Sequence, residues 1–346
     1  MRLPEPSGLP RGEPSAAEPT GATDGEQMLE YVRWQVSLGP RVPGSEAHRR
    51  LVEELGLRLE CYARRVVRHE FPVRLPDGEV ICTNLIGQFP ARRGGAPGAS
   101  STVLLGTHFD TRLRADRERN PLRRHQPIPG ANDGGSGTAV FLHLLPLLAQ
   151  GTQKRDVTVV FFDAEDVGDI AGNPFSLGAR RLVEQKPIPL PDEAVVLDMV
   201  GGKNLRLDLD AHILHHRPSY VLTRRLFAVG EPLDRNVFGW GQSASRGKLR
   251  YIISDQYPFM AAGVAACLLI DLDYPQWHTQ EDRPEAMAAE SLSTVAEALK
   301  RYLLPARSSG RRSFPACASP GGCRGRWPLR LPRGTAPGGR RVARHT

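Results

Sequence analysis

Cysteines are few and scattered in this chain of 346 residues, which contains five of them. Their odd number and irregular spacing show neither a disulfide framework nor a Cys-x-x-Cys metal site, although a bridge between Cys61 and Cys82 stays open. Long apolar runs are also missing, because no stretch approaches the roughly 18 to 20 apolar residues that span a bilayer. We therefore expect no membrane-spanning helix.

An export signal is likewise missing from the start of the sequence. The first residues are rich in proline, glycine and glutamate and contain no apolar stretch of the kind found in signal peptides. We expect a cytoplasmic protein by default, and an exported one if the true start differs.

Acidic residues are absent from the C-terminal segment, and this explains the positive charge. The formal net charge is +8, and residues 305–346 contain ten arginines and no acid, so the residues before them carry −2 together. We therefore expect no nucleic-acid partner for the body of the protein. This segment and residues 1–24 are rich in Pro and Gly without apolar periodicity, so they are predicted to be disordered and to flank one domain at 25–304.

Short β-rich apolar runs alternate with helical stretches from residue 101 onward. The clearest strands are predicted at residues 102–106, 157–162, 194–197 and 265–270. This alternation is typical of an α/β three-layer sandwich, in which helices cover both faces of a central, mostly parallel mixed sheet.

Polar residues follow several of these strands directly. The candidates are His108 and Asp110, Glu165 and Asp166, Asp198, Asp133 in a glycine-rich loop, and a late histidine, His278. Because the carboxyl ends of parallel strands form one edge, we expect these side chains to converge on one crevice. Imidazoles and carboxylates without thiols favour a catalytic zinc site. Glu165 would supply the base of a metal-assisted reaction, and Asp110 would orient the ring of His108.

These residues carry a family resemblance that covers roughly residues 25–304. Five motifs resemble those of the zinc aminopeptidases of family M28. They are the His-x-Asp of His108, the Asn-Asp-Gly-Gly-Ser-Gly around Asp133, the pair Glu165-Asp166, the Leu-Asp-Met-Val-Gly around Asp198 and the late His278. Within that superfamily, the Gly-Pro-Arg-Val-Pro-Gly-Ser entry and Trp-His-Thr at 277–279 are similar to glutaminyl-peptide cyclotransferases, especially bacterial ones. Ser254 stands where such cyclases have one of two consecutive acids.

The resemblance to the cyclases implies a zinc-dependent acyl transfer on the N-terminus of a peptide. It implies a zinc ion held by Asp133, Asp166 and His278, with Glu165 as proton shuttle. It further implies catalytic roles for Asp198 and Asp255 and a pocket wall formed by Trp277. The reaction expected is conversion of an N-terminal glutamine to pyroglutamate, with release of ammonia.

The resemblance to the aminopeptidases implies a second interpretation of the same residues. Two zinc ions would then be bridged by Asp133, with His108 and Asp198 completing the second site, and Glu165 would activate the hydrolytic water. A catalytically silent binding domain is a third option, which no residue favours because all ligands and Glu165 are present. The number of metal ions and the oligomeric state stay open.

The charge-dense segment 112–124 lacks periodicity and predicts a mobile loop at the rim of the crevice. It fits either a solvated loop or one that meets acidic groups of a substrate. The histidines at 212, 215 and 216 match no metal-ligand spacing and are predicted to lie on the surface, away from any metal.

Overall fold

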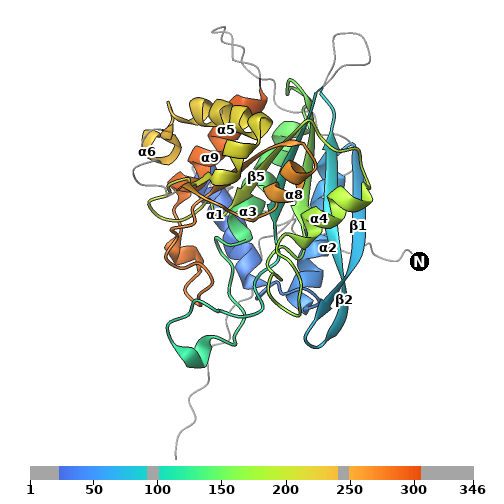
Figure 1. Ribbon diagram of the computed structural model, residues 1–346, viewed down its shortest axis with the longest axis vertical. Helices are drawn as coiled ribbons and strands as arrows, with labels where there is room; N and C mark the ends of the chain where they lie inside the picture. The colour runs from blue at the N-terminus through green and yellow to red at the C-terminus, as the bar shows by residue number, and fades with distance from the viewer. Residues whose placement is uncertain (1–22, 92–100, 241–248, 305–346) are drawn as a thin grey trace, which may run out of the picture. The chain divides into compact units, whose positions relative to one another are not determined.

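A six-stranded mixed sheet forms the centre of the fold in the computed structural model, which describes residues 23–91, 101–240 and 249–304 (Figure 1). The strand order is β1-β2-β4-β3-β5-β8. The strands are β1 (Arg65–Leu75), β2 (Gly78–Phe89), β3 (Thr102–His108), β4 (Asp156–Phe162), β5 (Glu193–Asp198) and β8 (Ala265–Ile270). Strands β4, β3, β5 and β8 are parallel, whereas the hairpin β1-β2 adds to β4 in antiparallel fashion. The predicted mostly parallel mixed sheet is therefore confirmed.

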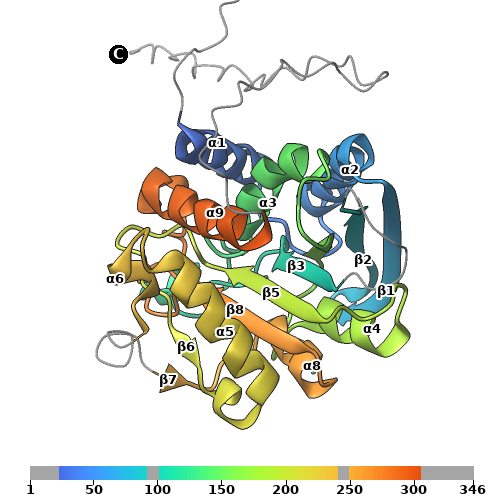
Figure 2. The ribbon, with the colours of Figure 1, turned by 90° about the horizontal axis from the view of Figure 1, so that it is seen from above.

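Helices cover both faces of this sheet (Figure 2). One face packs against α1 (Asp24–Ser37), α2 (Glu46–Tyr62), α3 (Gly135–Leu148) and α9 (Ala289–Leu303). The other is covered by α4 (Leu177–Gln185) and α8 (Gln256–Ala261), while α5 (Arg217–Gly230) packs along the edge strand β8 and against α9. The remaining elements are α6 (Arg235–Phe238), a small sheet of β6 (Leu209–Asp210) and β7 (Leu249–Arg250), and the 3-10 helices η1 (Pro121–Arg123), η2 (Ala211–His215) and η3 (Pro284–Ala286).

The predicted disordered segments, 1–24 and 305–346, lie outside the described residues apart from Thr23 and Asp24. Thr23 caps α1, because its hydroxyl accepts the N–H of Glu26 and the Glu26 carboxylate accepts the N–H of Thr23. The helices and strands all belong to one unit within Met1–Ala306. Among the described helices, none is long and apolar enough to cross a membrane.

Helix α3 is apolar on nearly every side because it lies between the sheet and the outer helices. Eleven of its fourteen residues are buried. Its close approach to the sheet depends on Gly137, where an added Cβ would lie 2.1 Å from the hydroxyl of Thr107 and 3.1 Å from Cβ of Leu197. The amino end of α3 is thereby fixed next to the carboxyl ends of β3 and β5.

The strand order marks these carboxyl ends as the place where a sheet of this kind would bind a ligand. The chain passes from β3 to β4 on one side and later to β5 on the other, so the connections diverge around β3. A change of direction of this kind leaves an opening above the strand ends, which is where open α/β sheets bind ligands.

Candidate active site

Three parallel strands and two loops bring the predicted polar residues together. His108 ends β3 and Asp198 ends β5, while Glu165 and Asp166 follow β4. Asp133 precedes α3, and His278 comes from the long loop after β8. All six side chains are buried.

Two groups of potential metal ligands share Asp133. In the first, Nε2 of His108 lies 3.2 Å from Oδ1 of Asp133 and 3.5 Å from Oδ1 of Asp198. In the second, Nε2 of His278 lies 3.5 Å from Oδ2 of Asp133 and 3.3 Å from Oδ1 of Asp166. The ligand atoms within each group lie within 4.8 Å of one another, so each group can surround one cation.

Several of these donor atoms have no hydrogen-bond partner among the described residues. They are Nε2 of His108, Oδ2 of Asp133, Oδ2 of Asp166 and Oδ1 of Asp198. Buried polar atoms are rarely left unpaired, because the loss of hydration is not compensated. Nitrogen and carboxylate donors of this kind suit zinc, so the residues present fit a bound metal ion.

Backbone strain is concentrated at the same place. His278 itself has a positive φ of 55°, and so do Ala164 before Glu165, with 57°, and Met199 after Asp198, with 48°. Non-glycine residues rarely adopt this conformation, and such strain gathers at functional sites. It sets the direction in which the adjoining ligands leave the backbone.

Glu165 and Asp255 form a pair of buried acids beside the ligands. Burial raises the pKa of Glu165 well above its usual value, and the nearby carboxylates of Asp255 and Asp198 raise it further. Burial, followed by Asp198 and Asp110, likewise raises the pKa of Asp255. Oε1 of Glu165 accepts the Ser176 hydroxyl at 3.1 Å. Both acids are therefore easier to protonate than a carboxylic acid in water.

Asp110 organises the loop that carries Glu165 and Asp166. Its two oxygens accept the backbone N–H groups of Glu165 at 3.0 Å and of Asp166 at 3.1 Å. Oδ1 of Asp110 also lies 3.5 Å from Nδ1 of His108, on the side of the ring away from Asp133. The hydrogen bonds of Asp110 therefore hold the backbone of Glu165 and Asp166, and its carboxylate lies near the ring of His108.

An arginine links the two outer ligands of the second group. Nη1 of Arg112 lies 3.3 Å from Oδ1 of Asp166, and Nη2 lies 2.6 Å from Oδ2 of Asp116. Oδ1 of Asp116 in turn lies 2.9 Å from Nδ1 of His278. Asp166, followed by Asp116, raises the pKa of His278 to about 10 against the opposing effect of burial. The loop predicted at the rim is therefore anchored in the site at its first residue.

Aromatic rings flank the ligands on two sides. Trp277 is half-buried against the cluster that contains Val196 and Ile270, and its ring centroid lies 4.8 Å from that of His278. Phe175 lies under Arg112, with 5.3 Å between the guanidinium carbon and the ring centroid. Trp277 therefore lies directly beside a member of the second ligand group.

A third group, made of His48, Cys82 and Asp163, is also within ligand distance. Its atoms are already hydrogen bonded, because Nε2 of His48 lies 2.9 Å from Asp163 and Oδ2 of Asp163 accepts the N–H of Thr83 at 2.6 Å. This group is best described as a clamp between α2, β2 and β4. Cys61 and Cys82 form no disulfide with each other.

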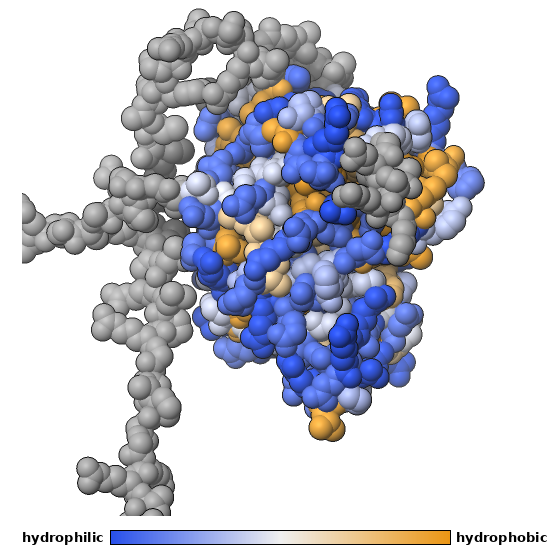
Figure 3. All heavy atoms as spheres, turned by 90° about the vertical axis from the view of Figure 1, so that its left-hand side faces the viewer, coloured by the Kyte–Doolittle hydropathy of each residue, from blue (hydrophilic) through white to orange (hydrophobic). Residues whose placement is uncertain are grey.

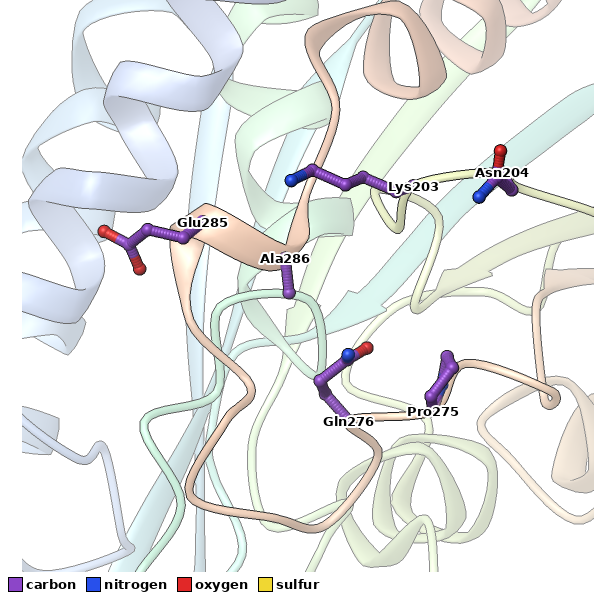
Figure 4. Close-up of a pocket in the computed structure, with 6 residues that line it drawn as sticks. All are labelled: Lys203, Asn204, Pro275, Gln276, Glu285 and Ala286. Atoms are coloured by element: carbon purple, nitrogen blue, oxygen red, sulfur yellow. The ribbon is translucent and has the colours of Figure 1, made fainter.

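A pocket of about 400 Å³ is lined in part by Pro275 and Gln276, which precede His278 in the same loop (Figure 4). Lys203 and Glu285 line it, and the side chain of Gln276 points into it. None of the metal-ligand candidates lines this pocket. It is therefore separate from the reactive centre.

Sequence reasoning missed the residues that support the ligands. Asp282 accepts the N–H groups of Asn132 at 2.9 Å and Asp133 at 3.1 Å, and burial raises its pKa to about 7. Arg41 is fully buried and donates to the carbonyl oxygens of Pro129 and Gly130. No spacing pattern marks such residues, since each acts on backbone far away in the sequence. Of the three histidines predicted at the surface, His215 is exposed, while His212 and His216 are partly buried.

Comparisons with known proteins agree with this geometry. The family model described as Peptidase family M28 matches residues 84–303. Aminopeptidase YwaD of Bacillus subtilis is 28% identical over 195 residues, which make up 51% of this chain and 39% of that protein. The match thus spans about two-fifths of the length of this curated relative.

Two solved structures share the fold over most of the chain. Glutaminyl cyclase of Tannerella forsythia has a TM-score of 0.70 and 25% identity, covering 82% of this chain and 99% of that one. A Zn-dependent exopeptidase of Parabacteroides distasonis has a TM-score of 0.68 and 27% identity, covering 80% of this chain and 96% of that one. Both cyclases and peptidases therefore share this architecture.

Proposed function

The chain belongs to peptidase family M28, and from that premise we propose that it is a zinc-dependent glutaminyl-peptide cyclotransferase. It converts the N-terminal glutamine of a peptide to pyroglutamate and releases ammonia. The observation that carries this proposal is the half-buried Trp277 beside His278, in a site that also contains the buried acids Glu165 and Asp255. The likeness to a glutaminyl cyclase over almost that protein's whole length supports it.

Asp133, Asp166 and His278 would hold the zinc ion. Their buried oxygen and nitrogen atoms surround one position, and Oδ2 of both Asp133 and Asp166 lacks a partner in the part of the chain that the structure describes. Bound zinc supplies Lewis acidity toward the γ-carboxamide oxygen of the glutamine. Arg112 and Asp116 hold two of the three ligands in place.

Glu165 provides the path for the proton. The α-amine of the glutamine attacks its own γ-carboxamide carbon, so one C–N bond forms while the bond to the departing nitrogen breaks. Glu165 accepts the proton from the amine and donates it to that nitrogen, which leaves as ammonia. Its raised pKa suits this exchange, because a group that both accepts and donates a proton works best with a pKa close to the working pH.

Asp198 and Asp255 tune Glu165 in this proposal. Both are buried acids near it, and their negative charges contribute to its raised pKa. The hydroxyl of Ser254 donates to Oδ2 of Asp198 at 2.9 Å and fixes the orientation of that carboxylate. Trp277 would form a wall for the glutamine side chain, because its ring lies against the ring of a proposed ligand.

A metallo-aminopeptidase is the second candidate, and the first ligand group favours it. Nε2 of His108 and Oδ1 of Asp198 are buried without partners among the described residues, as expected for a second metal ion bridged by Asp133. Glu165 would then deprotonate the water that attacks the first peptide bond. The similarity to an aminopeptidase and to an exopeptidase supports this alternative.

Mass spectrometry of two peptides distinguishes the candidates. A short peptide that begins with glutamine and a matched peptide that begins with leucine are incubated with the zinc-loaded protein. Loss of ammonia from an otherwise intact glutamine peptide supports the cyclotransferase. Release of the first residue as a free amino acid, from the leucine peptide above all, contradicts it and favours the aminopeptidase.

Replacing Glu165 by glutamine tests its role as proton shuttle. The Glu165→Gln protein keeps the shape of the side chain and the ligand set, so it should bind zinc as before. Its turnover should fall roughly 10²- to 10⁴-fold, the usual contribution of a positioned acid or base. Glu184→Gln, at an exposed position on α4, is the matched control. Turnover that survives in Glu165→Gln would rule out the assignment.

A further inference from the structure

Arg117 lies over the face of Trp277 at the mouth of the site. Its guanidinium carbon is 3.7 Å from the centre of the tryptophan ring, and its backbone N–H donates to the carbonyl oxygen of His278 at 3.2 Å. The side chain is exposed to solvent. A cation is thus held beside the proposed pocket wall, next to a proposed metal ligand.

The charge of Arg117 is not neutralised by this protein within the described ranges. Arg112 on the same loop is bound by Asp116 and Asp166, and Arg123 pairs with Glu281. Arg117 itself has no ion-pair or side-chain hydrogen-bond partner among those residues.

The loop as a whole is strongly basic. Residues 112–124 contain six arginines and two acids, a formal net charge of +4. Figure 3 shows the side that faces left in Figure 1, and its lower part is mostly hydrophilic except for an apolar tip at the bottom. The rim therefore presents positive charge to whatever approaches the crevice.

Stacking prepares Arg117 to bind a carboxylate. The flat face of a guanidinium rests on an aromatic ring, which restricts its rotation and leaves the N–H groups along its edge free. These edge N–H groups match the two oxygens of a carboxylate. Because the side chain is ordered before binding, less conformational entropy is lost when the ion pair forms.

The position of Arg117 selects which part of a substrate it meets. The first residue of a peptide would occupy the metal site, and an extended chain advances roughly 3.5 Å per residue. The second or third residue is therefore the part that passes the rim.

We propose that Arg117 is a specificity-determining residue, which binds the carboxylate of an Asp or Glu at the second or third position of the peptide. This inference rests on the proposed function only in that the substrate is a peptide N-terminus. It makes acidic N-terminal sequences the favoured substrate class of the site.

The test compares peptides that differ only at these positions. One pair of peptides begins with Gln-Glu or Gln-Gln, and a second pair has the same Glu-to-Gln change at the third residue. We measure kcat/KM for each peptide with the wild-type protein, Arg117→Ala, Arg117→Lys and Arg119→Ala. Arg119 is exposed on the same loop but does not stack on Trp277, so its variant removes an equal charge without the proposed contact.

We expect the wild-type kcat/KM to favour the acidic peptide at one of these positions about three- to tenfold, the range of a partly exposed but ordered ion pair. Arg117→Ala should abolish this preference through a higher KM at unchanged kcat, and Arg117→Lys should restore part of it. Arg119→Ala should keep it. Added salt should weaken it in the wild type.

The proposal is overturned if Arg117→Ala retains the wild-type preference, if no preference exists at either position, or if Arg119→Ala removes it equally. The ratio is read on whichever product forms, so hydrolysis in place of cyclisation contradicts the proposed function alone. If neither peptide reacts, the proposed function fails, and the difference in Kd between the peptides for the zinc-loaded protein must still disappear in Arg117→Ala.

Discussion

Removing the charge of Asp116 should weaken zinc binding without removing a ligand. Oδ1 of Asp116 lies 2.9 Å from Nδ1 of His278, the ring nitrogen that faces away from the proposed metal position. Oδ2 of Asp116 forms an ion pair with Arg112. A carboxylate in this place fixes the tautomer of the histidine and makes the ligating nitrogen more basic. In Asp116→Asn an oxygen acceptor stays beside the ring while the negative charge is lost.

The expected loss of zinc affinity depends on how exposed Asp116 is and on its ion pair with Arg112. Such carboxylates typically contribute a factor of 10 to 100 to metal affinity. The side chain of Asp116 is 32% exposed and its charge is shared with Arg112, so the lower end applies. We expect zinc affinity to fall about tenfold in Asp116→Asn, or about 1.4 kcal/mol. Asp116→Ala loses the acceptor as well and should fall further, by about a hundredfold.

Competition for zinc against a chromophoric chelator at fixed pH measures this affinity. Asp169→Asn is the matched control, because Asp169 is an exposed acid whose side chain contacts neither ligand group. Melting of the metal-free proteins is recorded in parallel, so that a general loss of stability is detected. Equal zinc affinity in Asp116→Asn and Asp169→Asn would refute the reasoning.

Two further predictions concern stability. Although burial opposes it, hydrogen bonds from Tyr302, Arg155 and Arg225 hold the pKa of Glu193 below its usual value. The ionised form therefore stabilises the fold above the unfolded pKa, and this contribution is lost as the pH falls through the folded pKa. Glu193→Gln should lower the free energy of unfolding by roughly 1–2 kcal/mol at pH 7. The difference between wild type and variant should shrink below about pH 4. If urea denaturation gives the same difference across this pH range, the prediction is contradicted. Gly178→Ala places a Cβ 2.2 Å from the carbonyl oxygen of Asp163 and 2.5 Å from Oδ1 of Asn84, so it should cost about 1–3 kcal/mol. An unchanged denaturation midpoint would show that the start of α4 shifts to accommodate the added methyl group without cost, and would contradict this prediction.

The central strands were predictable because they are buried on both faces. Continuous apolar runs at residues 157–162 and 265–270 correspond to β4, which begins one residue earlier, and to β8. The first two helices and the hairpin with its turn at Gly78 also follow from apolar spacing and turn residues. Helix α5 was not anticipated, because half of its residues are exposed and these include apolar Val221 and Ala228 beside Arg224 and Arg225, so its apolar spacing is irregular. Its buried side packs against β8 and α9.

The candidate ligands were predictable for a similar reason. A polar residue directly after a buried strand has a fixed place at the sheet edge, so His108, Asp166 and Asp198 could be expected to meet once the sheet was expected. The loop at residues 112–124 was only partly foreseen. Arg112 is buried and tied to Asp166 and Asp116, a contact with no signature in the local sequence.

The sequence by itself determined the central strands and the chemical types gathered at their carboxyl ends, because these depend on local periodicity and on the strand that precedes each residue. Only the tertiary structure decided the contacts between distant loops. Asp282 reaches the N–H of Asp133, Asp116 reaches His278, and Arg117 comes to lie on Trp277 through loop closures of well over a hundred residues. Such contacts form between segments whose own sequences prefer no particular partner, so they become definite only when the folded sheet brings those segments together.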